Sequence, residues 1–347
     1  MSAALQPFAF QWHITDNCDQ RCKHCYIFSK DPGRQLVSIT LPQMEAVIDN
    51  CCDMCETFNR RPSFALTGGD PILHPDFWRL VELLRERDLT FAIMGNPFHL
   101  TDEVCERLAA MGCERYQMSL DGLRETHDWF RKPGSFDCTL EKLKCLHHAG
   151  ILSTIMTTVS STNIREIPEL IDVVVSDDVD VYAFARFCPG TETRSNGISP
   201  QEYRILLDTC WQKFAEHEEA GCRTGFDLKD HLWTLYRYEI GDFEIPQDAE
   251  PGIIYDGCNC GNCHMTILPN GDLYACRRLN SKVGNVFEDR IADVWLGPME
   301  EYRKYDAFEK CSKCELLPYC RGCPAVAYGA TGSFYGADPQ CWKEIGE

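Results

Sequence analysis

The sequence lacks a long apolar run, and it lacks an excess of positive charge. Its 347 residues include 34 Lys and Arg against 53 Asp and Glu, which gives a formal net charge of −19. A chain this acidic repels phosphate backbones and anionic lipid surfaces, so we expect neither nucleic acid nor a membrane as a partner. The N-terminus, MSAALQPFAFQWHITDNC, also lacks the basic start and apolar stretch of a signal peptide. We therefore expect a cytoplasmic protein.

Cysteine, in contrast, is abundant, with 22 residues. A reducing compartment does not favour disulfides, and clustered cysteines there more often bind metal or take part in redox chemistry. Three lie within residues 18–25 and nine within residues 258–341. Cys51 and Cys55 share an apolar helical stripe, which predicts core packing. Cys188 follows the sixth expected strand, near the expected cavity, and is a further functional candidate.

The first two-thirds of the chain alternates between strand-like and helix-like segments. Apolar strands are expected at residues 8–15, 63–70, 89–96, 115–122, 152–160 and 180–190, with helices between them. Such alternation predicts an α/β fold with a parallel sheet, here a partial (β/α)6 barrel, whose ligand-binding groups lie at the carboxyl ends of the strands. We expect this barrel over residues 1–200, a helical connector over 201–257, and a small Cys-rich domain held by metal over 258–347.

The segment ITDNCDQRCKHCYIFSKD places Cys18, Cys22 and Cys25 in a CxxxCxxC spacing directly after the first strand. A loop of this kind can wrap three thiolates around a cubane of four irons, and this leaves one iron open for a small molecule. The spacing does not by itself separate iron–sulfur from zinc. A zinc site completed by His13 or His24 is one alternative, and three unrelated thiols are another.

CxxxCxxC after the first strand of a parallel (β/α)6 unit resembles the radical S-adenosylmethionine (SAM) superfamily. The resemblance implies that the amino and carboxylate groups of SAM chelate the open iron. It also implies that reduction of the cluster cleaves SAM to a 5′-deoxyadenosyl radical, which abstracts a hydrogen atom from the substrate. The cofactors then supply the difficult chemistry, and the protein supplies positioning and exclusion of water.

Further segments match the same family pattern. TGGDP ends the second strand, where the family places Gly-Gly-Glu-Pro, so Gly68, Gly69 and Asp70 are expected at the SAM amino group. Asp70 is one methylene shorter than the family's Glu, so its contact can pass through the backbone or water. The resemblance also implies polar contacts to SAM at other strand ends, from Ser119, Asp121, Asn96, Asn163 and Arg186. For the last three, a role in a turn or a helix cap is an equal alternative.

The C-terminal cysteines resemble the SPASM extension of radical SAM enzymes, with one interval of two residues where the family has three. The resemblance implies two auxiliary [4Fe–4S] clusters. The outer one would use Cys311, Cys314, Cys320 and Cys341. The inner one would use Cys276, Cys323 and two thiols of the CNCGNC segment, with Cys258 and Cys263 preferred over Cys260. A pair of zinc ribbons is the alternative for the spacing alone.

Enzymes with this pair of modules mostly modify ribosomally made peptides, so the resemblance implies a peptide substrate and a crosslink such as a thioether. Formylglycine-forming members carry Asp after the residue matching Cys276. This chain has Arg277 there, and a cation is a poor proton acceptor. Because the first strand begins near residue 8, we expect either a separate protein that binds a leader peptide or a substrate held by the barrel and SPASM surfaces. A reducing electron donor is also required. The alternatives are oxidation of a small molecule in a haem or quinone-cofactor pathway, and a zinc-stapled binding protein.

The cysteine pattern predicts the metal content of the protein. After anaerobic purification and reconstitution with iron and sulfide, three cubanes should give about twelve irons per chain, measured with a colorimetric iron assay. A count of about eight would indicate one incomplete auxiliary site, with CNCGNC as the first suspect. Bound zinc with almost no iron would contradict the radical SAM interpretation.

Overall fold

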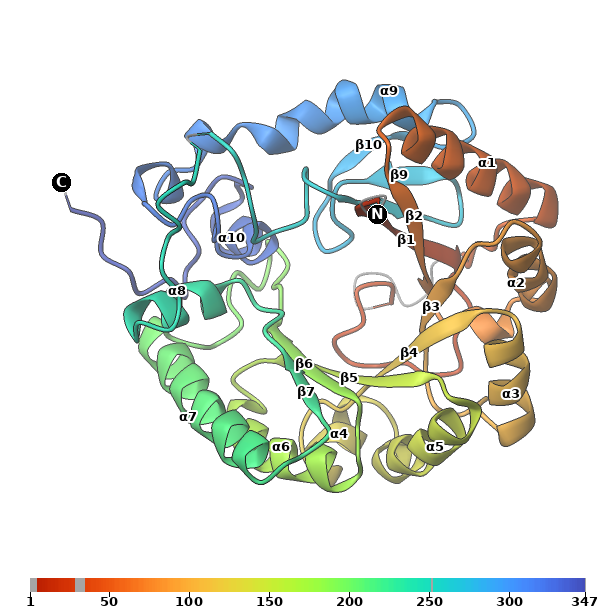
Figure 1. Cartoon of the computed structure of the whole chain (residues 1–347), viewed down its shortest axis with the longest axis horizontal. Helices are drawn as coiled ribbons and strands as arrows, with labels where there is room; N and C mark the ends of the chain where they lie inside the picture. The colour runs from red at the N-terminus through yellow and green to blue at the C-terminus, as the bar shows by residue number, and fades with distance from the viewer. Residues whose placement is uncertain (1–4, 29–34, 251, 347) are drawn as a thin grey trace. The chain divides into compact units, whose positions relative to one another are not determined.

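The computed structural model describes residues 5–28, 35–250 and 252–346 (Figure 1). The chain forms two compact units. The first comprises Met1–Leu120, His127–Ile155 and Cys263–Glu301, and the second comprises Asp121–Thr126, Met156–Asn262 and Tyr302–Glu347. In the described residues, no helix is both long enough and apolar enough to cross a membrane.

The first unit is built on a largely parallel sheet. Its strand order is β10-β9-β8-β1-β2-β3-β4, followed by the first half of β5. The strands are β1 (Pro7–Thr15), β2 (Arg61–Gly68), β3 (Phe91–Met94), β4 (Cys113–Ser119), β5 (Leu152–Val159), β8 (His264–Ile267), β9 (Asp272–Tyr274) and β10 (Lys282–Asn285). β1 pairs in parallel with both β2 and β8, whereas β8, β9 and β10 form an antiparallel meander.

Alternation along β1 explains how this sheet is packed. Phe8, Phe10 and Trp12 are buried on one face, where Phe8 contacts Trp295 edge-on with ring centroids 4.8 Å apart. The opposite face of the same strand carries His13. Aromatic side chains bury large apolar areas, so these residues fix which face of β1 receives the helices. A slip of one residue would exchange the two faces.

The helices of the first unit follow the strands in chain order, and Figure 1 shows α1, α2 and α3 succeeding one another beside β1 to β4. They are α1 (Leu41–Thr57), α2 (Phe77–Glu86), α3 (Asp102–Ala110), α5 (Ser135–Ala149) and α9 (Ile291–Leu296), together with most of α4 (Arg124–Phe130). Thr40 and Gln43 form a capping box at the start of α1. Cys51 and Cys55 are buried along α1, as the helical stripe predicts.

The second unit contains the end of β5, β6 (Val181–Arg186) and β7 (Gly225–Asp227), with β6 and β7 paired in parallel. Its helices are α6 (Ile167–Ser176), α7 (Pro200–Glu219), α8 (Leu232–Glu239) and α10 (Pro324–Thr331). An aromatic cluster packs α7 against α8 and β7, with the rings of Phe214 and Phe226 stacked 4.1 Å apart. Short 3-10 turns connect most of the C-terminal segment.

The structure confirms the predicted α/β fold with an open parallel sheet, and strands β1 to β6 lie where the alternation predicts them. It adds β7 to β10, which the sequence did not reveal because each is only three or four residues long. β8 to β10 extend the sheet beyond β1, although they lie in the Cys-rich segment. The domain boundaries drawn from composition stay predictions.

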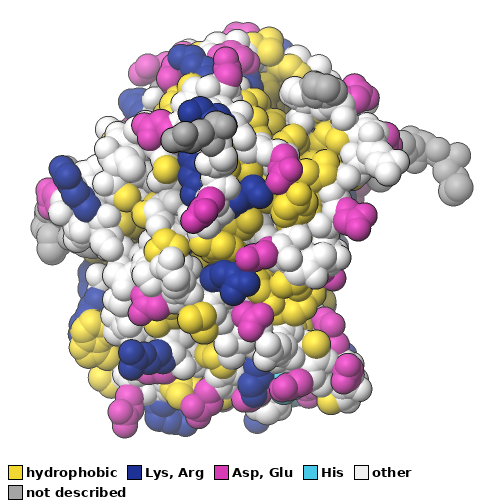
Figure 2. Space-filling model, turned by 90° about the vertical axis from the view of Figure 1, so that its left-hand side faces the viewer, with side chains coloured by type: hydrophobic (Ala, Val, Ile, Leu, Met, Phe, Trp, Pro, Cys, Tyr) yellow, Lys and Arg dark blue, Asp and Glu magenta, His cyan; other side chains and the backbone are white. Residues whose placement is uncertain are grey.

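The surface carries the negative charge in a dispersed form. On the face drawn in Figure 2, acidic, basic and apolar side chains are interspersed, without one continuous acidic field. Dispersed charge of this kind keeps a protein soluble without steering one particular partner.

Candidate active site

The Cys loop of the first unit starts at the carboxyl end of β1. Cys18, Cys22 and Cys25 are all partly exposed. The loop is held on both sides: the Asp16 N–H donates to the Val37 carbonyl at 2.8 Å, and the Lys23 N–H donates to the Phe130 carbonyl at 2.9 Å. The three sulfurs are therefore carried by a backbone that is anchored to other segments of the unit.

Nitrogen donors surround these sulfurs. The Gln20 N–H lies 3.4 Å from Cys18 Sγ, Asn96 Nδ2 lies 4.0 Å from the same atom, and an Arg131 guanidinium nitrogen lies 3.7 Å from Cys22 Sγ. Burial raises the pKa of the Cys18 thiol to about 11. Such a thiol becomes a thiolate when a cation such as iron binds it, and N–H donors then stabilise the negative sulfur. This donor set fits an iron–sulfur cluster.

The turn after β2 lies directly against the start of the Cys loop. The N–H groups of Gly69 and Asp70 donate to the Thr15 and Asn17 carbonyls at 2.7 and 2.8 Å. A Cβ on Gly68 would lie 2.1 Å from the Thr15 carbonyl oxygen, and a Cβ on Gly69 would lie 2.0 Å from that of Asn17. Only glycine permits this approach, so the two motifs singled out in the sequence form one structural element.

Asp70 is fully buried beside this turn. Its Oδ1 accepts a long hydrogen bond from the Ile72 N–H at 3.4 Å, and its Oδ2 has no hydrogen-bond partner among the described residues. Burial raises its pKa to about 7. A buried carboxyl with one unmatched oxygen is costly unless a cation or a donor meets it. The SAM ammonium is such a group, so the environment of Asp70 fits the role expected for it.

Two residues that the sequence analysis did not single out lie next to Asp70. Asp19 and His99 each place a ligand atom within 4.8 Å of the Asp70 carboxylate. Asn96 joins them, because its Nδ2 donates to Asp19 Oδ1 at 2.8 Å. Asp19 follows Cys18 directly, and this adjacency was the only signal in the sequence that could have identified it. Ser119 ends β4 in the same unit and is half-buried.

In the second unit, Asp121 and Asn163 organise backbone. The Thr158 N–H donates to Asp121 Oδ1 at 3.0 Å, and Asn163 Nδ2 donates to the Asp121 and Thr158 carbonyls at 3.0 and 2.9 Å. The Ser160 N–H donates to Asn163 Oδ1 at 2.8 Å. These bonds match the alternative role of Asn163 in a turn, and they fix the chain after β5.

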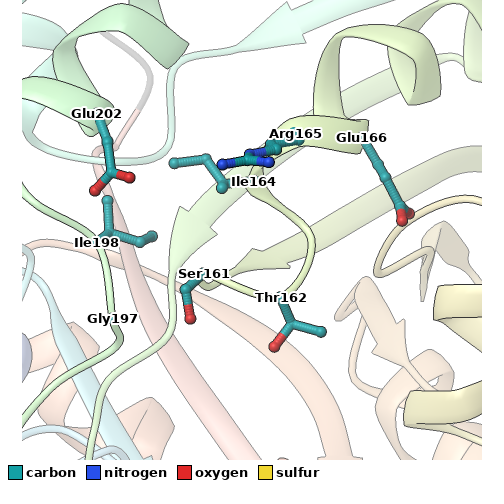
Figure 3. A pocket seen from close by; sticks show the side chains of 8 residues that line it. All are labelled: Ser161, Thr162, Ile164, Arg165, Glu166, Gly197, Ile198 and Glu202. Carbon is teal, nitrogen blue, oxygen red and sulfur yellow. The ribbon is translucent and has the colours of Figure 1, made fainter.

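A pocket of about 410 Å³ lies next to this turn (Figure 3). The loop after β5 and the 3-10 turn η2 (Ile164–Glu166) form one side, and the start of α7 forms the other. Glu166 accepts hydrogen bonds from the Leu123 N–H and the Thr126 hydroxyl, and Glu202 accepts one from the Ser199 N–H. Both acids therefore hold backbone in place around the pocket. Its lining residues are Ser161, Thr162, Ile164, Arg165, Glu166, Gly197, Ile198 and Glu202.

Arg186, for which the resemblance implies a contact to SAM, lies in a buried network of charged groups. Its guanidinium is completely buried and lies 3.0 Å from Asp230 and 2.6 Å from Asp338. A further bond of 3.0 Å joins it to Gln340 Oε1. Although burial favours the neutral acid, Arg186 holds the pKa of Asp230 below its usual value. All three guanidinium nitrogens are engaged within the second unit, so the structure assigns Arg186 to a buried ion-pair network.

The network also supports two of the candidate cluster ligands. Asp338 Oδ2 accepts the Cys323 N–H at 2.7 Å, and the Asp338 carbonyl accepts the Cys341 N–H at 3.0 Å. Arg186 therefore acts on these cysteines through Asp338. The sequence could not reveal this arrangement, because Asp230 and Asp338 are 44 and 152 residues away from Arg186.

The four cysteines expected at the outer auxiliary cluster gather in the second unit. Burial raises the pKa of Cys311 to about 12, and the neighbouring sulfurs of Cys341 and Cys314 contribute to this rise. Cys320 is buried, and the sulfurs of Cys311 and Cys341 raise its pKa as well. Thiols that destabilise one another's charge in this way are suited to a shared cation.

The cysteines expected at the inner cluster are divided between the units. Cys263 and Cys276 belong to the first, and Cys258, Cys260 and Cys323 belong to the second. Arg321 donates to the Cys258 carbonyl at 2.7 Å and so fixes the start of the CNCGNC segment. Cys188 Sγ lies 4.0 Å from Cys323 Sγ, which places this further candidate beside an expected ligand.

The fold and the site define the class of protein. A radical SAM superfamily model matches residues 12–174, and a SPASM iron–sulfur cluster-binding model matches residues 258–324. The chain is therefore a radical SAM enzyme with a C-terminal SPASM domain, and its cofactors are [4Fe–4S] clusters and SAM. When bound, these cofactors supply a 5′-deoxyadenosyl radical after one-electron reduction. The chain's own residues anchor the Cys loop, fix the turn after β2 against it and order the backbone at Cys323 and Cys341.

Known relatives fall into more than one group. An AdoMet-dependent heme synthase of Methanosarcina barkeri is 27% identical over 96% of both chains. The mycofactocin maturase MftC of Mycobacterium tuberculosis is 26% identical over 96% of this chain and 83% of its own. The structure of Streptococcus suis SuiB with bound SAM superposes with a TM-score of 0.75 at 20% identity, covering 97% of this chain and 78% of SuiB. SuiB is also known with its precursor peptide SuiA bound.

The close approach at Gly69 predicts a sensitive site. Gly69→Ala places a Cβ against the Asn17 carbonyl, next to Cys18, so the Cys loop must shift. SAM cleavage by the reduced protein should fall about a hundredfold, measured as 5′-deoxyadenosine formation. Gly190→Ala is the matched control, because a Cβ there meets no atom within 4 Å. Equal activity of the two variants would contradict this role for the turn.

The Arg186 network predicts a loss of stability and of auxiliary iron. Arg186→Met leaves Asp230 and Asp338 buried without their cation, and unfolding in urea should show a loss of about 3–5 kcal/mol. Iron per chain should fall, because Cys323 and Cys341 lose their support. The KM for SAM in substrate-free cleavage should stay unchanged. A selective rise in the KM for SAM would instead support the contact between Arg186 and SAM that the resemblance implies.

Proposed function

We propose that this radical SAM enzyme modifies a ribosomally made peptide and forms a crosslink such as a thioether. The observation that carries the proposal is the joint presence of the SAM loop and the Cys-rich C-terminal segment in one chain, an arrangement shared with a mycofactocin maturase along 96% of this chain. A crosslink removes two hydrogen atoms from the peptide. The 5′-deoxyadenosyl radical would take one as 5′-deoxyadenosine, the second would leave as a proton when the new bond forms, and an auxiliary iron–sulfur cluster would accept the remaining electron.

The identity of Arg277 argues for a reaction other than formylglycine formation. It follows Cys276 at the position where formylglycine-forming enzymes carry a proton-accepting Asp, and no described carboxylate forms an ion pair with it. A guanidinium stays protonated at any working pH, so it cannot accept the proton. A crosslink or another oxidation is more consistent with this residue.

Oxidation of a tetrapyrrole is the second candidate function. The relative named heme synthase matches 96% of this chain, and 96% of that relative is covered in turn. Haem-type macrocycles carry propionate carboxylates, and a cation in the site suits them.

Separate leader-binding and electron-donor proteins stay predictions under the peptide proposal.

The test compares the two substrate classes in one assay. The anaerobically reconstituted protein is reduced with dithionite in the presence of SAM and given either peptides encoded beside its gene or Fe-coproporphyrin III. Mass spectrometry then follows the substrate, and chromatography follows 5′-deoxyadenosine. The proposal expects a peptide that loses two hydrogen atoms, with one 5′-deoxyadenosine formed per event.

Two outcomes separate the alternative functions, and one variant serves as the control. Conversion of the porphyrin without any change in a peptide would establish the second candidate. A peptide that gains an aldehyde would favour formylglycine formation. The Cys18→Ala variant is the control for both substrates, because it removes one ligand of the SAM-binding loop. Product formation that persists in this variant would show that the chemistry does not depend on the loop.

A further inference from the structure

One face of β1 and β8 in the first unit carries a small polar cluster. His13 lies on β1 opposite the buried aromatic face, and His264 lies on β8. The ring of His13 lies edge-on to that of Tyr26, with centroids 5.9 Å apart. The charges of Arg277 and His264 both act on His13. Tyr26, from the Cys loop, covers the guanidinium of Arg277, whose Cζ lies 4.8 Å from the ring centroid.

The turn that carries Arg277 is rigidly held. The Cys276 N–H donates to Ser281 Oγ at 2.9 Å, and the Ser281 hydroxyl donates to the Cys276 carbonyl at 2.8 Å. Ser281 is buried, and its own carbonyl accepts the Ala275 N–H at 3.1 Å. The backbone from which Arg277 projects is therefore held in one position by hydrogen bonds on both sides of the turn.

Two buried nitrogens in this cluster have no hydrogen-bond partner in the part of the chain that the structure describes. They are Nε of Arg277 and Nε2 of His13, both shielded from solvent. A buried polar group left without a partner costs roughly 1–3 kcal/mol, so such groups are uncommon unless a ligand meets them. Within the described residues, Arg277 has no ion pair with a carboxylate. The cation is therefore not neutralised by the described part of its own unit.

His13 stays uncharged in this setting. Burial lowers the pKa of its imidazole well below the usual value, and the nearby Arg277 and His264 lower it further. A neutral imidazole can still donate one N–H to an acceptor. The cluster thus offers one permanent cation, Arg277, and one neutral hydrogen-bond donor, His13. This combination matches a ligand group with one negative charge better than a group with two negative charges.

The cluster also lies close to both groups of cysteines within the first unit. Tyr26 directly follows Cys25 and Arg277 directly follows Cys276, so the contact between these two side chains brings the two chain segments together. A group bound at Arg277 would therefore be held next to the SAM-binding loop. Anchoring a substrate at this distance orders its reacting carbon before the radical forms, which is how positioning contributes to rate.

We propose that Arg277, assisted by His13, binds a carboxylate of the substrate. The inference rests on the proposed function, and it deepens it: the reacting segment of the peptide carries an acidic side chain or a free C-terminus. Arginine suits this task, because its planar fork can donate two parallel hydrogen bonds to one carboxylate. Tyr26 stacks on the guanidinium and fixes its plane.

The experiment compares carboxylate and neutral forms of one probe. The first probe is the peptide converted in the preceding assay, synthesised with each carboxylate in turn replaced by a carboxamide. The second is Fe-coproporphyrin III against its tetramethyl ester, with binding to the SAM-loaded holoenzyme followed by absorbance. The wild type should prefer one carboxylate form by about tenfold or more in KM or Kd, and Arg277→Gln should lose this preference.

Matched variants separate anchoring from a structural role. Arg278→Gln, at the exposed neighbouring position, should keep the preference. Arg277→Lys keeps the charge without the fork and should retain part of it. Iron content is measured in both Arg277 variants, and the proposal expects the carboxylate preference to be lost in Arg277→Gln while the iron is retained.

The outcomes are distinct for the two proposals. If only the porphyrin binds, and binds through Arg277, the peptide function is wrong and the carboxylate anchor stands. If the peptide is converted equally well as carboxylate and as carboxamide, the anchor is wrong and the peptide function stands. A rise in the KM for SAM in Arg277→Gln would instead assign this cation to the SAM carboxylate. If no probe shows a preference that depends on Arg277, the inference is overturned.

Discussion

The close contact between the turn after β2 and the start of the Cys loop is the constraint on which the site depends. Two adjacent glycines let the backbone of one strand end hydrogen-bond to the backbone of the next, with carbonyl oxygens where any Cβ would lie. This contact gives the loop its path and brings Asp70 beneath it. The three thiols, the acidic turn and the neighbouring polar groups are then positioned by main-chain geometry more than by side-chain packing.

Buried charge in this protein falls into two kinds. Arg186 is fully matched by Asp230 and Asp338, and its contribution is to order the C-terminal segment. Within the described residues, Asp70 Oδ2 and Arg277 Nε have no hydrogen-bond partner, although the Arg277 side chain as a whole is only half-buried. Breaking a matched buried pair is costly, and an unmatched buried group is stabilised when a ligand supplies its counterpart. We therefore expect the first kind of residue to support the structure and the second kind to meet cofactor and substrate.

Much of the fold could be predicted because local patterns determine it. Alternating apolar residues located β1 to β6, and cysteine spacing identified both cysteine groups. Arg186 was expected at SAM because it stands at a strand end, whereas the acidic partners that it has in the structure lie far along the chain and left no local signal. Asp19 and His99 were missed for the same reason, because only the folded loop brings them to Asp70. β8 was missed because its four residues acquire strand geometry by pairing with β1.

The pairing of β1 with β8 has a consequence for biosynthesis. The two strands are neighbours in the sheet, yet more than two-thirds of the chain separates them. Until the ribosome has released that length, the side of β1 that pairs with β8 is an open sheet edge. The Cys loop then follows a strand that has only one of its two neighbours. Contacts of such long range form late and slowly. The nascent enzyme therefore cannot complete the sheet beside its Cys loop until β8 has left the ribosome, so the surroundings of this loop form late in synthesis.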